Sequence, residues 1–370
     1  MKRNIIKQGE KDYLKEHSKE KIAFYREYLK AYFAVLLNSP YTKAINIYDV
    51  FCGVGIYSKD NSKGSPIVAM EVIKEFNTSV SMTLLINDGD TKRVKTAQNY
   101  IENNYNKEFE FEAYNFLSER IFELTINKIK KKNNENNLIF IDPHGYKDIY
   151  KKDIINIMEA GKSEILIFLP IHQMYRFIKP TKTDSENPSY IPLKRFITEF
   201  ELEYSAKSPK EYINHVQKSF SFNEKYYTAS YILQSDSKNY YSLFFITKNL
   251  KGLEKAVETK WGLDTLCGKG FEQKKKPSLF ADEEKEEKKE DCLGSLYEKL
   301  KIYLKIKKTN NELYEFTLKN GFLLKHTNDI LKKLQNENKL HFDRDIRKNA
   351  FYINYENYRD DNIKYEVQIR

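Results

Sequence analysis

Ile45–Gly55, with the sequence Ile-Asn-Ile-Tyr-Asp-Val-Phe-Cys-Gly-Val-Gly, is the stretch that decides the fold. Its mostly apolar first part, Ile45–Phe51, predicts a buried strand. Gly53 and Gly55 then predict a tight turn with positive φ that lets the backbone come close to a ligand. Asp49 lies near the end of the strand, and a buried carboxylate is costly unless it is paired, so a role at a site is expected. Ordinary strand–loop junctions also show this pattern, so it establishes no site alone.

Length and charge set the broad class of the protein. The chain has 370 residues and a formal net charge of +10, with a sequence pI near 9.0. This length predicts one large domain and a small one. The basic excess suits a nucleic-acid partner, although a Lys/Asn-rich composition explains it equally well.

The cysteines and the apolar runs indicate the compartment. Cys52, Cys267 and Cys292 are far apart and odd in number. This argues against a disulfide framework or a zinc cluster, so we expect no metal site. We expect the protein to be in the reducing cytoplasm. No apolar run is long enough to span a bilayer, and the charged N-terminus does not resemble a signal peptide, so no membrane association is expected.

Strands and helices alternate from Ile45 to Leu169, which predicts an α/β fold with a parallel, doubly wound sheet. Two later β-rich runs, Tyr226–Gln234 and Tyr240–Thr247, predict an antiparallel hairpin that completes it. Pro180–Pro192 is expected as a polar loop. The other expected strands are Ser81–Ile86, Glu108–Tyr114, Leu138–Ile141 and Glu164–Leu169, and the expected helices include Lys19–Leu37, Ile67–Phe76, Lys92–Asn104, Leu117–Lys132, Lys152–Ala160 and Leu250–Trp261.

Polar side chains follow the second and third expected strands and begin the first crossover helix. Asp88 ends the second strand, where a carboxylate can hold the hydroxyls of a ribose. Asp90 is expected to cap the next helix instead. Asn115 follows the third strand and could accept a hydrogen bond from an adenine amine. Ser65 in Gly64-Ser65-Pro66 is expected as an N-cap.

The strand Leu138–Ile141 ends in Asp142-Pro143-His144-Gly145-Tyr146. Proline removes a backbone donor and ends the pairing, so Asp142 is expected at the carboxyl edge of the sheet. Ligands bind at that edge in open α/β sheets. His144 and Tyr146 are the nearby candidates for contacting a substrate, although a histidine on a loop is more often a surface residue.

The C-terminal part has a different pattern. Residues 274–291 are charged and predict a solvated helix or linker between a domain of residues 1–273 and one of residues 292–370. Three expected helices and short strands at Lys339–Phe342 and Ala350–Asn354 predict a winged helix-turn-helix. Its candidate nucleic-acid contacts are Lys325, Thr327, Asn328, Lys332, Arg344, Arg347 and Lys348. A protein-contact module is the alternative.

These motifs together resemble the three-Cys-motif partner (TcmP) family of methyltransferase-like proteins. The resemblance runs in order through Tyr48–Gly55, Gly64-Ser65-Pro66, Phe140–Gly145 and the late run Tyr240–Asn249. It implies a Rossmann-like class I methyltransferase sheet, parallel with a C-terminal antiparallel hairpin, and S-adenosylmethionine (SAM) as cofactor. An operon-encoded three-Cys-motif protein would be the implied partner. Cys52 and Asn115 depart from the usual family pattern.

The resemblance implies methyl transfer from SAM to an exocyclic amine of a nucleobase in DNA or RNA. Asp142 and Pro143 would hold the amine, and His144 or Tyr146 would contact the base. The expected cofactor residues are Asp49, Phe51, Gly53, Gly55, Ser65, Asp88 and Asn115. Two alternatives stay open: a non-catalytic SAM-binding or partner-binding subunit of a multi-protein system, such as a defence system, and a protein methyltransferase.

Overall fold

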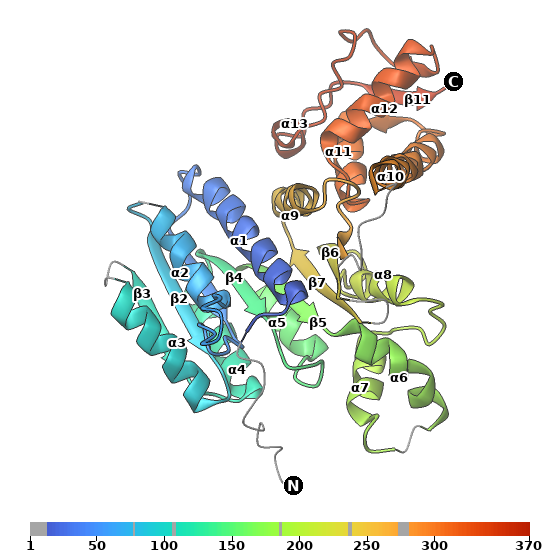
Figure 1. Ribbon diagram of the computed structural model, residues 1–370. Helices are drawn as coiled ribbons and strands as arrows, with labels where there is room; N and C mark the ends of the chain where they lie inside the picture. Colours follow the sequence, from blue (N-terminus) through green and yellow to red (C-terminus); the bar gives the residue numbers. More distant parts are fainter. Residues whose placement is uncertain (1–12, 77, 106–108, 185–186, 236–238, 273–280) are drawn as a thin grey trace.

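A mixed eight-stranded sheet forms the centre of the molecule (Figure 1). The computed structural model describes residues 13–76, 78–105, 109–184, 187–235, 239–272 and 281–370. The strand order is β3-β2-β1-β4-β5-β7-β6-β8. The strands are β1 (Ala44–Asp49), β2 (Ser81–Asn87), β3 (Glu110–Tyr114), β4 (Asn136–Ile141), β5 (Lys162–Leu169), β6 (Tyr227–Gln234), β7 (Tyr240–Thr247) and β8 (Gly270–Glu272).

The pairing confirms the expected mostly parallel sheet. β1 pairs in parallel with β2 and β4, β2 with β3, and β4 with β5. β7 is antiparallel to both β5 and β6, which confirms the closing hairpin. The short β8, which the sequence did not predict, extends the β6 edge in parallel. This arrangement agrees with the expected Rossmann-like sheet, parallel with an antiparallel hairpin at its end.

Helices cover both faces of the sheet because successive strand residues point to opposite sides. Ile45 and Ile47 of β1 face one core, and Tyr48 faces the other. Within the described residues, no helix combines the length and apolarity needed to cross a bilayer. The first face carries α1 (Glu16–Leu37), α2 (Ser65–Glu75), α3 (Thr91–Asn104) and α9 (Leu250–Leu263); the second carries α4 (Ser118–Lys131), α5 (Lys151–Ala160), α6 (Ile171–Thr183), α7 (Ile191–Glu199) and α8 (Pro209–Ser219).

The expected loop Pro180–Pro192 was wrong at both ends, because it begins inside α6 and its last residues, Ile191 and Pro192, form the first turn of α7. Pro180 lies inside the last turns of α6. Proline there removes one helical hydrogen bond, but the neighbouring Ile178 and Thr181 are buried and hold the turn in place. Tertiary packing therefore outweighs the local preference.

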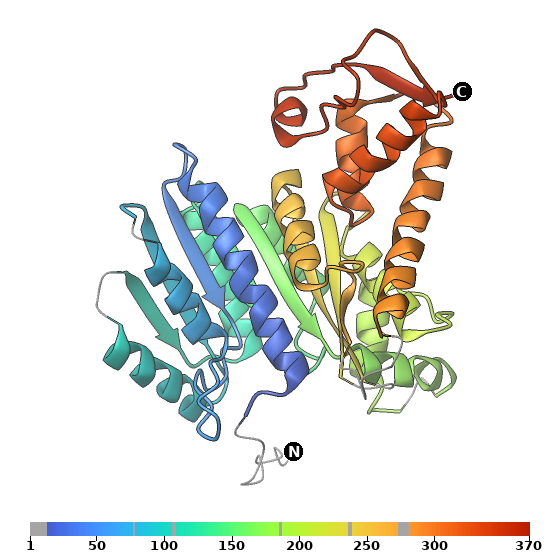
Figure 2. The same cartoon turned by 45° about the horizontal axis from the view of Figure 1, so that its top comes forward.

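A smaller unit follows the sheet. It contains α10 (Ala281–Tyr303), α11 (Asn310–Lys319), α12 (Leu324–Asn336) and α13 (Tyr355–Arg359), together with β9 (Lys308–Thr309), β10 (Leu340–Phe342) and β11 (Glu366–Ile369). The three strands form an antiparallel sheet in the order β10-β11-β9. Figure 2 shows α10 rising along the β6 side of the large sheet into this unit.

The strand expected at Ala350–Asn354 was wrong, because β10 pairs with β11 instead. Phe351 and Ile353 are buried while Tyr352 between them is exposed, so the segment imitates the alternation of a strand. Tyr352 has a φ of 50°, which is incompatible with strand geometry.

The smaller unit shares a hydrophobic core with α9. The Tyr314 hydroxyl donates to the Glu254 carboxylate, and Trp261 Nε1 donates to the Gly321 carbonyl at 2.9 Å. The charged run Asp282–Asp291 lies within α10. Residues 274–280 of the expected linker lie outside the described residues, and the three-part domain division stays a prediction.

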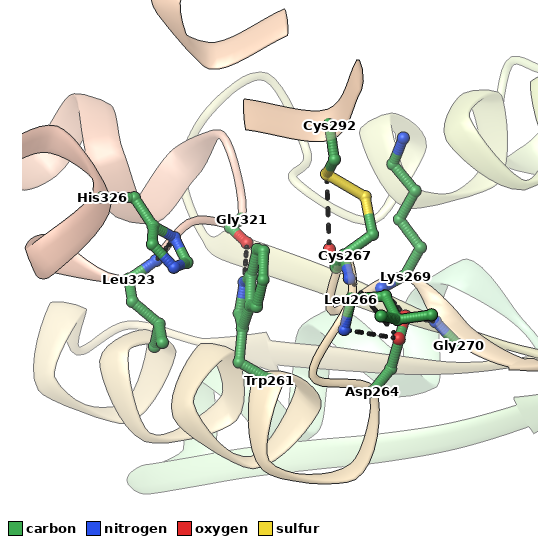
Figure 3. The surroundings of a disulfide bond; sticks show 10 residues. All are labelled: Trp261, Asp264, Leu266, Cys267, Lys269, Gly270, Cys292, Gly321, Leu323 and His326. Atoms are coloured by element: carbon green, nitrogen blue, oxygen red, sulfur yellow. Dashed lines mark hydrogen bonds between the residues drawn. A yellow bond between two sulfur atoms is a disulfide. The ribbon is translucent and has the colours of Figure 1, made fainter. Parts of the chain in front are cut away.

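The expectation that the cysteines form no disulfide was wrong. Cys267 and Cys292 are bonded, with their Cα atoms 5.9 Å apart (Figure 3). Both side chains are buried between the turn after α9 and the middle of α10. The two cysteines are 25 residues apart in sequence, and only the packing of α10 beside the turn after α9 brings them together, so the sequence did not predict the bond. Cys52 is a buried free thiol.

Candidate functional site

The carboxyl edge of the sheet between β1 and β4 is the candidate site. From β1 the chain continues outward to β2 and β3, whereas β4 leads the other way to β5. Such a switch in strand order leaves a crevice at the carboxyl ends, where α/β proteins bind ligands. Asp49 is the last residue of β1 and pairs with Phe140, so Asp142 just beyond β4 lies at the same edge. The two carboxylates expected from the sequence are thus brought to one place.

Asp49 is fully buried, and neither carboxylate oxygen makes a hydrogen bond to the described residues. Burial raises the pKa of Asp49 to about 7, the Ser65 hydroxyl opposes this rise, and the negative charge of Asp142 adds to it. The buried Tyr25 hydroxyl also lacks a partner there. A buried acceptor without a donor is costly in a folded protein, which points to a ligand that supplies the donor.

The glycine turn has the conformation that the sequence predicts. Gly53 and Gly55 have φ values of +63° and +74°, in the left-handed region. A Cβ on Gly55 would lie 3.0 Å from the Ala97 Cβ, so α3 packs directly against the turn. A Cβ on Gly53 would meet nothing within 4 Å, so the turn borders open space. The protein therefore leaves room on the Gly53 side.

Asp88 anchors the same turn. Its Oδ2 accepts from the Gly53 amide at 3.1 Å, and its Oδ1 accepts from the Asp90 amide at 2.9 Å. Only 7% of Asp88 is exposed. Asp90 caps α3, as expected, by accepting from the amides of Lys92 and Arg93.

Asn115 lies on the surface with both ends of its amide engaged. Its nitrogen donates to the Asp88 carbonyl at 2.8 Å, and its oxygen accepts from the Thr91 hydroxyl at 2.8 Å. Asn115 thus fastens the loop after β3 to the loop after β2. Its oxygen has one lone pair left for a cofactor.

Asn87 is a positioning residue that sequence reasoning missed. It is fully buried at the end of β2. Its amide nitrogen donates to the carbonyls of Val50 (3.1 Å) and Phe116 (3.2 Å), and its oxygen accepts from the Phe116 amide at 2.8 Å. It ties together the chain beyond the ends of β1 and β3. A polar residue closing an apolar strand was the available signal.

The N-cap expected at Ser65 was wrong, because Gly64 precedes the first helical residue, which is Ser65 itself. Ser65 is buried beside Asp49. The Gly64 amide donates to the Gly55 carbonyl at 2.6 Å, which holds the start of α2 against the glycine turn. Phe51, another expected cofactor residue, is half-buried and packs edge-on against Phe122.

Lys21 of α1 forms an ion pair with Asp142 Oδ2. Its side chain is 8% exposed, and its ammonium lies 4.4 Å from the centre of the Phe168 ring. The positive charge of Lys21 also lowers the pKa of Asp49. Lys21 was not among the predicted site residues, although a lysine on the apolar stripe that continues with Tyr25 and Tyr28 was a usable signal.

Aromatic rings surround this ion pair. His17 stacks on Tyr241 at 4.3 Å, and His172 packs edge-on against the same ring at 4.7 Å. Burial, followed by the charges of Lys15 and Lys21, lowers the pKa of His17 to about 4. His17 is therefore neutral at pH 7.

The remaining candidate residues of the loop after β4 have different surroundings. Pro143 is buried, whereas His144 is exposed and contacts the Arg93 guanidinium. Tyr146 is half-buried and packs edge-on against Phe196 of α7 at 6.2 Å. Tyr57, from the loop after the glycine turn, is also close to the site, since burial and the charge of Asp142 raise its pKa to about 12.

Most of the candidate nucleic-acid contacts lie on one unit and are exposed. Thr327 and Asn328 are the exceptions. Thr327 is fully buried and its hydroxyl forms a hydrogen bond with that of Thr317 at 2.7 Å, so it is no longer a candidate. Asn328 is half-buried, and its side-chain oxygen is an unpaired buried atom. Arg344 pairs with the adjacent Asp343. The exposed members are Lys325, Lys332, Arg344, Arg347 and Lys348.

Comparisons with known proteins show only a distant similarity to solved methyltransferase structures. No protein-family model matches it, and no curated protein matches it in sequence. Similar solved structures include the bifunctional kinase-methyltransferase WbdD, with 10% identity and a TM-score of 0.37 over 62% of this chain and 39% of that chain. An O-methyltransferase from Bacillus cereus in complex with SAH aligns with 11% identity and a TM-score of 0.34 over 60% of this chain and 80% of that one. The mycolic acid cyclopropane synthase CmaA1 aligns with 11% identity and a TM-score of 0.29 over 72% of this chain and 76% of that one.

The match thus spans about two fifths of the WbdD chain. Identities and TM-scores at this level assign no chemistry, so the residues of the site carry the functional assignment. The resemblance to the TcmP family stays a prediction.

Proposed function

We propose that the protein is a SAM-dependent methyltransferase whose cofactor lies at the carboxyl ends of β1 and β2. The observation that supports this most is Asp49, a fully buried carboxylate beside a left-handed glycine turn. It lies near the Ser65 hydroxyl, but neither of its oxygens accepts a hydrogen bond of normal geometry from the described residues. A cofactor with an ammonium group would supply hydrogen-bond donors to Asp49 and add a positive charge to that of Lys21.

The residues at this edge fit such a cofactor. Asp49 would accept from the amino group of the methionine part, and the space beside Gly53 would admit its backbone-like atoms. Asp88 would accept from the ribose hydroxyls through the lone pairs that its two amide bonds leave free. When bound, SAM supplies an electrophilic methyl group to an acceptor.

The acceptor we propose is an exocyclic amine of a nucleobase in DNA or RNA. Asp142 and the Pro143 carbonyl would accept hydrogen bonds from the amine and orient its lone pair, and Asp142 would take up the proton that leaves the nitrogen. His144 or Tyr146 would contact the base. Tyr146 would have to leave its contact with Phe196 to stack on it.

Incubation with radiolabelled SAM tests the activity. Transfer to DNA or RNA, but not to protein, is expected, and Asp142→Asn should lower it by about 100-fold or more. Asp148→Asn is the matched control, since Asp148 is an exposed aspartate on the same loop. Label in protein alone would contradict the nucleobase proposal and favour a protein methyltransferase.

A second candidate is a SAM-binding subunit without turnover. The ion pair between Lys21 and Asp142 favours it, because it occupies the carboxylate that would hold the acceptor amine. In that case neither the wild type nor Lys21→Met should transfer a methyl group. Tight cofactor binding without label transfer to DNA, RNA or protein would support this candidate.

We further propose that the smaller unit is a winged-helix module that contacts nucleic acid. The α11–α12 helix pair, the three-stranded sheet and the exposed basic residues support this. Lys332→Ala with Arg347→Ala should weaken DNA or RNA binding and reduce its salt dependence. If the unit instead binds a three-Cys-motif protein, the wild-type protein should show no binding to DNA or RNA.

A further inference from the structure

A cavity lies at the opposite, amino-terminal edge of the large sheet. Its volume is about 780 Å³, within the range of small-molecule sites. It is bounded by the first residues of β5, the C-terminal half of α1, the start of α9 and helix α13. Because β5 runs parallel to β4 and begins at Lys162, this cavity lies at the far end of the strands from Asp49 and Asp142.

Glu164 of β5 presents a carboxylate to this cavity. Two buried residues that also border the cavity hold it: Tyr28 donates to Oε2 at 2.5 Å and Thr247 donates to Oε1 at 2.8 Å. The residue itself keeps partial exposure. Each carboxylate oxygen can accept a second hydrogen bond, so donors in the cavity could still bind it.

The chain makes room for this carboxylate at Gly252. A Cβ at that position would lie 2.1 Å from Glu164 Oε1. Burial raises the pKa of Glu164 to about 7, although the hydroxyls of Tyr28 and Thr247 oppose the rise. The cofactor chemistry proposed for the other edge makes no use of this group.

Tyrosines form part of the cavity wall. Tyr32, Tyr227, Tyr355 and Tyr358 line it, and the hydroxyls of Tyr227 and Tyr358 lie 3.4 Å apart. Tyrosine faces stack on flat rings, and each such stack with a base is worth roughly 1–3 kcal/mol in other proteins. A flat heterocycle with donors on its edge would satisfy both the walls and Glu164.

The lining also carries an excess of positive charge. Its cations are Lys162, Lys248, Lys251, Lys255 and Arg359, and its acids are Glu164 and Asp361. Lys251 and Lys255 lie one turn apart at the start of α9. Four of the five cations pair with carboxylates outside the lining: Lys248 with Glu159, Lys251 with Glu254, Lys255 with Glu258 and Arg359 with Asp360. An anionic ligand would share these cations with their carboxylate partners. A ligand with a donor-bearing ring and an anionic group matches this distribution.

We propose that the cavity between β5, α9 and α13 is a second ligand site that binds a nucleotide, with its base edge on Glu164 between the tyrosines and its phosphate toward Lys251 and Lys255. A bare anion would leave Glu164 facing it, and an ammonium ligand would face the lysines. The ligand would contact α13, so its binding would also reinforce the docking of the smaller unit.

Calorimetric titration of the full chain with GMP, AMP and ribose 5-phosphate tests the site. At least one of the two nucleotides should bind tenfold or more tighter than ribose 5-phosphate. Glu164→Gln and Tyr358→Ala should each weaken nucleotide binding at least fivefold. Tyr297→Ala, a half-buried tyrosine of α10 outside the cavity, is the matched control and should bind as the wild type does.

Several results would overturn the proposal. Equal affinity for a nucleotide and for ribose 5-phosphate would leave a plain anion site. The absence of any binding, or unchanged binding in both Glu164→Gln and Tyr358→Ala, would remove the site altogether. Competition with S-adenosylhomocysteine would place the nucleotide at the carboxyl edge instead. Because the probes and variants differ from those of the methyl-transfer assay, either idea can fail alone.

Discussion

Asp49 is the residue on which the functional assignment depends. It ends a mostly apolar strand at the switch point of the sheet, and neither of its oxygens accepts a hydrogen bond from the part of the chain that the structure describes. A residue that only completed the core would be apolar there, because burial of an unpaired carboxylate lowers stability. The same residue that the sequence singled out is thus the one whose environment is least explained by folding alone.

This carboxylate should make the stability of the ligand-free protein depend on pH. Its folded pKa of about 7 is above the unfolded value near 3.9, so the stabilising contribution is present at low pH and is lost as the pH rises through 7. Asp49→Asn removes this loss. Between pH 5.5 and 7.5 the variant should gain about 2 kcal/mol relative to the wild type.

Urea unfolding of both proteins at the two pH values measures this difference. Glu164, which titrates in the same range, is present in both proteins and cancels in the comparison. A difference in unfolding free energy that stays constant with pH would show that Asp49 is ionised throughout.

At the residue scale the sequence predicted carboxylates better than their partners. Asp49, Asp88 and Asp142 follow strands, and local sequence places strand ends. Lys21 pairs with Asp142 from 121 residues away, which only the packing of α1 on the sheet brings about. Thr327 appeared suitable for nucleic-acid contact because helical position in the sequence does not fix which face is buried.

Helix α1 is the element that connects the two edges of the sheet. Its first half carries His17 and Lys21 to the carboxyl edge, and its second half carries Tyr28 and Tyr32 to the cavity at the amino edge. Its buried stripe includes three tyrosines and two phenylalanines, which anchor it firmly along the sheet. Both proposed sites therefore share one rigid wall.

The glycine turn offers a matched pair of substitutions. Gly55→Ala adds a Cβ 3.0 Å from Ala97 at a φ of +74° and should lower the unfolding free energy by about 2 kcal/mol or more. Gly53→Ala meets open space at a φ of +63°, so it should cost only about 1 kcal/mol and act mainly by weakening cofactor binding.

Chemical unfolding and titration with S-adenosylhomocysteine separate these effects. Equal stability losses for the two variants would contradict the packing of α3 against the turn. Wild-type affinity in Gly53→Ala would show that the open space does not serve the cofactor.

At the element scale, regular alternation made the sheet predictable and irregular segments misled. From Ile45 to Leu169 each expected strand and helix is present within a few residues of its bounds. Ala350–Asn354 failed because alternating burial arises there without pairing, and Pro180 failed because packing extends α6 past it. The short β8 could not be predicted, because its three residues form a strand only through pairing with β6.

The whole molecule is held together across the boundary between its two units. α9 packs against the large sheet on one side and α11 on the other, through Glu254–Tyr314 and Trp261–Gly321. The Cys267–Cys292 disulfide adds a covalent link beside these contacts (Figure 3). Together they fix the start of the smaller unit to the turn after α9.

Reduction of this disulfide should lower stability without unfolding the protein. A disulfide between residues 25 apart in sequence stabilises by about 3.5 kcal/mol in the chain-entropy account. Dithiothreitol should therefore lower the melting temperature by several degrees. The double variant Cys267→Ser, Cys292→Ser should melt at the lower temperature with or without reductant, and a wild type insensitive to reductant would contradict the covalent link.

Calorimetric titration of the full chain with S-adenosylhomocysteine at pH 8 tests the central claim most directly. We expect binding of one molecule per chain, weakened at least tenfold by Asp49→Asn and little changed by Asp148→Asn. Absence of binding to the wild type, or equal binding to Asp49→Asn, would contradict a cofactor held at the carboxyl end of β1.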